Sequence, residues 1–193
     1  MEFLNVRQKP RSAGGVLRWL LVVAAWSALA AALARAQAPA VEYAVKATDL
    51  YKFVPFVEWP PEALPPSDPL VICVVGRDRV SDLVDEAVNG QTSAGHPIRV
   101  VHGQSGSLRD AHCNILYVAL RGAAAVDALD RVRGQPVLTV TDAAQEPRAA
   151  GVVNFVVIDN RVRFEIDQHA AAENHLVISS KLLSLAIRVT PRP

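Results

Sequence analysis

The sequence predicts a single-domain α/β fold, a three-layer sandwich built on a mostly parallel sheet with an antiparallel edge hairpin. Two observations lead to this prediction. Continuous apolar runs rich in β-branched residues alternate with amphipathic helical segments, which is typical of parallel strands covered on both faces. Near the C-terminus, two alternating runs flank an Asp-Asn turn, which is typical of an antiparallel hairpin. We find no internal repeat in the 193 residues.

The first 36 residues predict a secretory signal peptide. Residues 19–33 form an apolar core, and Ala34-Arg35-Ala36 is an A-x-A site that places cleavage between Ala36 and Gln37. An uncleaved anchor is the alternative, but this run is shorter than the ~20 residues that a spanning helix needs. The n-region ahead of the core carries four basic residues: Arg7, Lys9, Arg11 and Arg18. With no lipobox cysteine, we expect a periplasmic protein exported across the inner membrane.

Removal of the signal changes the charge of the protein. The remaining residues 37–193 form one domain, and they carry 15 basic and 18 acidic side chains, a net charge of −3. The net positive charge of the full chain therefore comes from the signal. No basic stripe remains, so the composition argues against nucleic-acid binding.

Residues 40–57 have the periodicity of an amphipathic helix. Five side chains share one 80° arc on a helical wheel, at about 100° per residue: Tyr43, Ala47, Leu50, Val54 and Val57. Pro55 removes a backbone donor and should kink or end this helix in its last turn. The prolines at 60–61 and 65–66 then predict an extended linker.

The same segment concentrates the aromatic residues. Five of the eight aromatic side chains outside the signal lie within residues 43–59. On the wheel, Phe56 falls on the polar face beside Lys46 and Asp49. An aromatic ring in that position is typical of a residue that anchors a protein–protein interface. Alternatively, Pro55 changes the helical phase and the rings pack beneath the sheet. We expect at least one of Phe53, Phe56 and Trp59 to form a dimer or partner surface.

The middle of the chain alternates strands and helices. Strands are predicted at residues 69–76, 97–102, 114–120 and 136–141, and helices at 78–88 and 123–133. This order is typical of a Rossmann-like sheet with right-handed crossovers.

The pattern changes towards the C-terminus. Residues 152–158 and 161–166 flank Asp159-Asn160 and predict the hairpin. Residues 181–189 predict a final helix that Ser179 or Ser180 caps.

Four segments, in this order, identify a resemblance. They are LYKFVPFVEWP at 50–60, LTVTD at 138–142, GVVNFVVIDNRVRFEI at 151–166 and ISSKLLSLA at 178–186. Together they resemble the YfiR-like family of bacterial periplasmic proteins, over roughly residues 43–189. No single segment is specific, but four in order behind a signal peptide are.

The resemblance implies a regulatory function. The expected activity is repression of an inner-membrane diguanylate cyclase (YfiN-like) through its periplasmic region, which lowers cyclic-di-GMP signalling and biofilm formation. An OmpA-like outer-membrane lipoprotein (YfiB-like) would relieve the repression, and homodimers are expected. The alternative is a periplasmic small-molecule-sensing module that serves another membrane sensor.

Two cysteines predict one disulfide bond. Cys73 lies within the strand at 69–76, and Cys113 directly precedes the strand at 114–120. Cysteines on adjacent strands can reach the Cα separation of about 5.5 Å that a disulfide needs, and the periplasm permits the bond. The family resembles this chain in having such a pair, although its second pair is missing here. Two separate buried thiols, out of register, are the alternative.

We expect no catalytic, cofactor or metal site. The five histidines form no H-E-x-x-H pair and have no C-x-x-C companion. Gly76-Arg77-Asp78 follows the first strand without a G-x-G-x-x-G pattern. Asp142 ends the fourth strand, where open sheets often carry function, but a helix cap explains it equally well.

Overall fold

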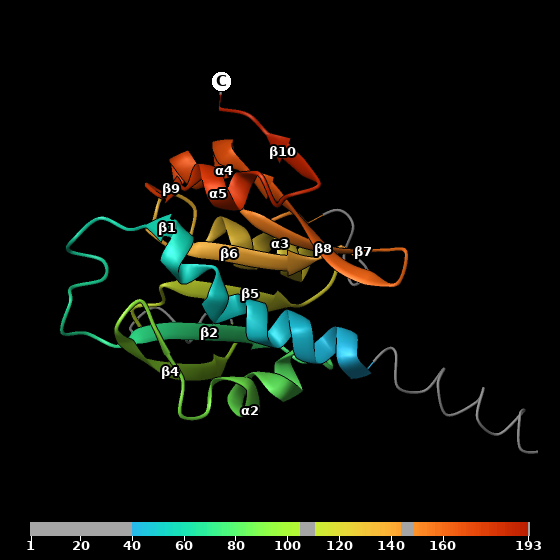
Figure 1. Cartoon of the computed structure of the whole chain (residues 1–193), viewed down its shortest axis with the longest axis horizontal. Helices are drawn as coiled ribbons and strands as arrows, with labels where there is room; N and C mark the ends of the chain where they lie inside the picture. Colours follow the sequence, from blue (N-terminus) through green and yellow to red (C-terminus); the bar gives the residue numbers. More distant parts are fainter. Residues whose placement is uncertain (1–39, 105–110, 144–148, 193) are drawn as a thin grey trace, which may run out of the picture. The chain divides into compact units, whose positions relative to one another are not determined.

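The structure, a computed structural model, describes residues 40–104, 111–143 and 149–192 (Figure 1). The predicted signal peptide and its cleavage site lie outside these residues. The described chain is mixed α/β, as the sequence predicts, with one eight-stranded sheet and one two-stranded sheet.

The large sheet has the strand order β10-β8-β7-β6-β5-β2-β4-β3. From β4 to β7 all neighbours are parallel, β7 and β8 form the predicted antiparallel hairpin, and β10 is parallel to β8. β3 adds an antiparallel edge beside β4. The strands are β2 Leu70–Gly76, β3 Thr92–Ser93, β4 His96–Gly103, β5 Ile115–Ala119, β6 Leu138–Asp142, β7 Val153–Ile158, β8 Arg161–Asp167 and β10 Arg188–Thr190.

Helices cover both faces of this sheet. The N-terminal helix (residues 40–52, blue) and α3 (Ala123–Asp130) lie on opposite faces in Figure 1. The side chains of β2 alternate between the two resulting cores. Ile72 packs in the core beneath the N-terminal helix, and Cys73 packs in the core beneath α3. This is the predicted three-layer arrangement.

The remaining helices are short. η2 (Ser81–Leu83) and α2 (Val84–Val88) follow β2. α4 (Gln168–Glu173) follows β8 directly, and the Asp167 side chain caps it by accepting a hydrogen bond from Ala170 N at 2.9 Å. Neither α4 nor the two-stranded sheet of β1 (Val57–Glu58) and β9 (Val177–Ile178) is predicted from the sequence.

The C-terminus corrects one prediction. Ser179 does cap a helix, but that helix, α5 (Ser180–Leu183), is only four residues long, and the chain then enters β10. The predicted helix at 181–189 is therefore wrong beyond Leu183. Ile187 N donates to Phe164 O at 3.0 Å, so the end of the chain pairs with the open edge of β8 instead of continuing the helix. The hairpin thus lies one strand inside the edge.

The N-terminal helix buries most of its predicted stripe. Ala47, Leu50, Val54 and Val57 are all at least 93% buried. The helix ends at residue 52, and a 3-10 turn, η1 (Val54–Phe56), takes its place. Pro55 lies in the first positions of η1, where its missing N–H breaks no hydrogen bond.

Lys46 is not on the wet face of the helix as the wheel predicts. Its side chain is fully buried, and its Nζ lies 2.7 Å from Asp142 at the end of β6 and 2.7 Å from Glu42 one turn earlier. Burial lowers the pKa of Lys46, but hydrogen bonds to the two carboxylates outweigh burial and raise it overall. Asp49 is half-buried, and burial raises the pKa of its carboxyl. The ion pair therefore joins the N-terminal helix to the sheet.

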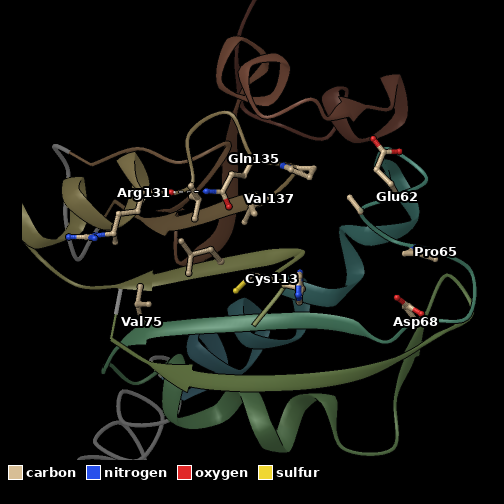
Figure 2. A pocket seen from close by; sticks show the side chains of 14 residues that line it. Glu62, Pro65, Asp68, Val75, Cys113, Arg131, Gln135 and Val137 are labelled. Carbon is tan, nitrogen blue, oxygen red and sulfur yellow. Dashed lines mark hydrogen bonds between the residues drawn. The ribbon is translucent and has the colours of Figure 1, made fainter. Parts of the chain in front are cut away.

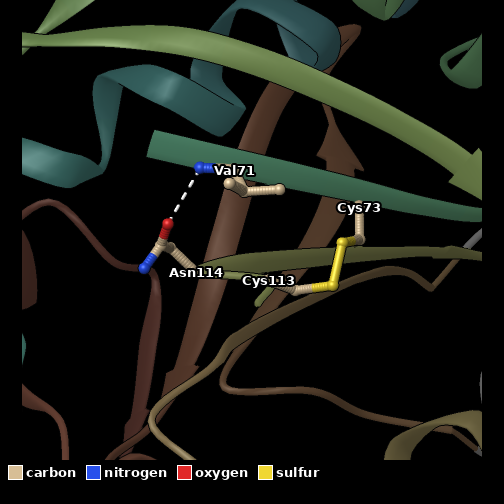
Figure 3. Close-up of a disulfide and its surroundings, with 4 residues drawn as sticks. All are labelled: Val71, Cys73, Cys113 and Asn114. Carbon is tan, nitrogen blue, oxygen red and sulfur yellow. Dashed lines mark hydrogen bonds between the residues drawn. A yellow bond between two sulfur atoms is a disulfide. The ribbon is translucent and has the colours of Figure 1, made fainter. Parts of the chain in front are cut away.

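The structure contains the disulfide Cys73–Cys113, with the Cα atoms 5.6 Å apart (Figure 3). Asn114, the next residue, accepts a hydrogen bond from Val71 N at 2.8 Å. This bond sets Cys113 beside the middle of β2, so the out-of-register alternative does not hold. The disulfide closes a segment of 40 residues that includes α2, β3 and β4.

We expect the double variant Cys73→Ala/Cys113→Ala to lose about 4 kcal/mol of unfolding free energy. The reason is that a bond across 40 residues restricts the unfolded chain. Urea denaturation measures this loss. Alkylation of the native periplasmic protein without reductant should add no mass, and addition of two alkyl groups would contradict the disulfide.

We expect Lys46→Met to cost about 3–5 kcal/mol of unfolding free energy near neutral pH, because Asp142 is left buried without its cation. The raised pKa means that the folded state holds this proton more tightly than the unfolded state. The contribution of Lys46 is therefore complete below pH 10.5 and is lost as the pH rises through the folded-state value. Denaturation curves of both proteins from pH 7 to 11.5 should converge only at the alkaline end. A constant difference would contradict the ion pair.

Candidate functional site

The aromatic segment, residues 50–60, continues from the N-terminal helix into β1. Val57 lies opposite Ile178 and Glu58 lies opposite Val177 in the antiparallel pair with β9. The ladder extends by one bond, because Ser179 N donates to Phe56 O at 2.9 Å. The segment is thus clamped to a part of the chain about 120 residues later in the sequence.

Phe53 is a core residue, which corrects its assignment to a contact surface. It is 4% exposed, and its ring centroid lies 5.2 Å from that of Phe164 and 5.9 Å from that of Phe155. The helical wheel fails here because the helix ends before Phe53. The ring fixes the aromatic segment to both arms of the hairpin.

The four segments that carry the family resemblance meet in one half of the molecule. LTVTD is β6, which pairs with β7 of the hairpin. The aromatic segment packs on the hairpin through Phe53 and pairs with ISSKLLSLA through β1 and β9. Lys46, just ahead of the aromatic segment, pairs with Asp142 of LTVTD. These segments therefore build one continuous packing unit.

The outer face of the β1–β9 pair is the strongest candidate for a binding surface. Glu58 and Val177 lie opposite each other on its solvent side, and Val177 is 46% exposed. Beside them, Lys181 of α5 places its Nζ 5.4 Å from the half-buried Phe56 ring. We call this surface the ribbon face: Phe56, Glu58, Trp59, Val177 and Lys181.

Trp59 closes the ribbon face at the end of β1. The side chain is half-buried and packs against the core beneath the N-terminal helix. Its indole Nε1 is buried and finds no acceptor among the described residues. Phe56 and Trp59 therefore both contribute to the core while part of each ring stays accessible.

Sequence reasoning missed three residues of the ribbon face: Glu58, Val177 and Lys181. Two-residue strands carry no periodicity, so nothing local pairs Glu58 with Val177. The one available signal was Lys181, which directly follows the N-cap region of α5 and is the only basic residue in ISSKLLSLA.

The carboxyl edge of the sheet holds polar groups, but they bond to one another. Tyr117 Oη donates to Asp78 at 2.7 Å, and the other Asp78 oxygen accepts from Ser81 N at 2.7 Å. Burial raises the pKa of Tyr117, and the neighbouring Asp78 raises it further. Asp142 binds Lys46, so it serves the packing of the N-terminal helix. No nucleophile next to a base results from this arrangement.

The histidines lie apart. His96 contacts Asp68 O, His102 contacts Asp85, and His169 contacts Glu173. Across the described ranges, no three His, Cys, Asp or Glu side chains are grouped to hold a metal ion. Of the helices within these ranges, none has the length and apolar character to cross a membrane.

The comparisons with known proteins fit this picture. A search of curated proteins finds no match. The pattern of the family described as YfiR/HmsC-like matches residues 43–187, a range that contains all four segments of the packing unit. The chain therefore belongs to the YfiR/HmsC-like family, a regulatory family, which indicates a periplasmic regulator of cyclic-di-GMP signalling.

Proposed function

We propose that this protein binds the periplasmic region of an inner-membrane diguanylate cyclase and represses it. Lower cyclic-di-GMP and less biofilm follow from this repression. An OmpA-like outer-membrane lipoprotein competes for the protein and relieves the cyclase, and the protein acts as a homodimer. Family membership supports the signalling context.

The observation that carries the proposal is the ribbon face. Aromatic rings that are fixed in the core and partly accessible lose little conformational entropy on binding, which is the character of interface hot spots. Lys181 over Phe56 and the adjacent Glu58 supply charges of both signs at the rim. Leu185, 57% exposed just past α5, adds apolar surface nearby. We assign the cyclase to this face.

The charge of the exported chain also supports a protein partner. Its net charge is −3, so it has no long-range attraction for nucleic acid or for anionic membrane. Contacts with the cyclase would then depend on local packing at the ribbon face and only weakly on salt.

We expect Phe56→Ala to weaken binding of the cyclase periplasmic domain at least 30-fold, since loss of a hot-spot ring costs about 2 kcal/mol or more. Trp59→Ala should act in the same direction. Titration of the isolated periplasmic domain of an inner-membrane diguanylate cyclase from the same organism, in a calorimeter or on a biosensor, measures both affinities.

Val126→Ala is the matched control, because Val126 is an exposed apolar residue on α3, across the sheet from the ribbon face. Its affinity should equal that of the wild type. Unchanged affinity in both aromatic variants would remove the ribbon face from the proposal. Unchanged cyclic-di-GMP after deletion of the gene would overturn the regulatory function itself.

A further inference from the structure

A cavity of about 630 Å³ lies between the sheet and α3, on the side away from the ribbon face. Its floor is apolar and includes Val75, Leu116, Ala128 and Val132. Cys113 of the disulfide also lines it. Protein sites for small molecules measure about 300–1,000 Å³, so this cavity has the volume of a ligand site.

The outer wall of the cavity is the proline linker between β1 and β2, and hydrogen bonds hold it in place. Asn114 Nδ2 donates to Ala63 O at 2.8 Å, and Asn114 is itself buried. Further along, His96 Nδ1 lies 2.8 Å from Asp68 O. Two turns close within the linker, at Pro60–Ala63 and at Pro65–Asp68. The wall is therefore preformed.

Charge at the rim distinguishes between classes of ligand. Figure 2 places Glu62 and Asp68 at one end of the cavity and Arg131 at the other, with Cys113 between them. Arg131 is neutralised by Asp127, which it meets through two hydrogen bonds of 2.8 and 3.2 Å. Neither Glu62 nor Asp68 forms an ion pair with any residue in the described ranges. The rim thus presents two uncompensated carboxylates above an apolar floor.

We propose that this cavity binds a small organic cation with an apolar body, such as a primary amine on an aromatic or aliphatic chain. The apolar body fills the space over Leu116 and Val132, and the ammonium group faces Glu62 and Asp68. Because both carboxylates are exposed, they select the sign of the ligand while the apolar floor supplies most of the affinity.

The rate at which the disulfide is reduced provides a second measure of ligand binding in the cavity. Cys113 lines the cavity and is half-buried, whereas Cys73 is fully buried. A thiol reductant can therefore reach Cys113 through the cavity. A bound amine covers that sulfur, so occupancy should slow reduction of the Cys73–Cys113 bond.

Three probes with one apolar body test the proposal: 3-phenylpropylamine, 3-phenylpropanol and 3-phenylpropanoate. Titrations of the full periplasmic domain, followed by amide NMR shifts, should give at least tenfold tighter binding for the amine than for the carboxylate, with the alcohol between them. The shifts should centre on Cys113, Leu116 and Val132. Reduction by dithiothreitol should slow severalfold with saturating amine.

Two variants separate charge from shape. Glu62→Gln/Asp68→Asn changes only exposed linker residues, so it should bring the affinity for the amine to within about twofold of that for the alcohol and leave thermal stability unchanged. Val132→Trp should abolish binding of all three probes by filling the cavity. Val126→Trp, on the solvent side of α3, is the control and should bind like the wild type.

Three results would overturn the proposal: no binding at millimolar probe, equal binding of amine and carboxylate, or shifts that centre elsewhere. None of them bears on the proposed regulation of the cyclase, because the cavity and the ribbon face pack against different cores. Conversely, a Phe56→Ala protein that no longer binds the cyclase but still binds the amine would support the cavity assignment and leave it independent of the ribbon face.

Discussion

The aromatic segment is fixed at both ends, and the organisation of this half of the molecule depends on that constraint. Ahead of it, the buried Lys46–Asp142 ion pair ties the N-terminal helix to β6. Behind it, β1 pairs with β9. Between these two attachments, Phe53 packs on Phe155 and Phe164 of the hairpin. A buried ion pair adds little net stability by itself, but it penalises any docking of the helix that leaves either charge unpaired. The pair therefore selects one position of the segment.

The sequence predicts those elements of this arrangement in which apolar residues repeat at regular intervals. The apolar stripe of the N-terminal helix, the buried strand β2 and the Asp159-Asn160 hairpin each repeat a pattern over several residues, and all three are present. The β1–β9 pair and β10 are two and three residues long, so they have no detectable period. β10 forms on an edge of β8 that only the assembled sheet provides, and β1 and β9 pair with each other across about 120 residues of sequence.

The candidate site was predicted less well than the fold, for two physical reasons. The wheel continues the helix past residue 52, whereas Pro55 lies in a 3-10 turn, so Phe53 points into the core instead of outward. The wheel also places Lys46 on the polar face, and it cannot foresee that Asp142, 96 residues later, supplies a buried partner for it. The second error has a local clue, since Glu42 lies one turn before Lys46 and could accompany it inward.

The linker between β1 and β2 touches both the ribbon face and the cavity, since Trp59 precedes it and Glu62 and Asp68 lie within it. A ligand can shift a protein between two states only if it binds one of them better. Here, Asn114 fixes the linker at Ala63, four residues after Trp59, through a partly buried hydrogen bond. A cation in the cavity would therefore influence the ribbon face through the linker, by strengthening or breaking that bond. Asn114 positions Cys113 beside β2 and also holds the linker at Ala63, so among the described residues it connects the disulfide to the wall of the cavity and to the linker that follows the aromatic segment.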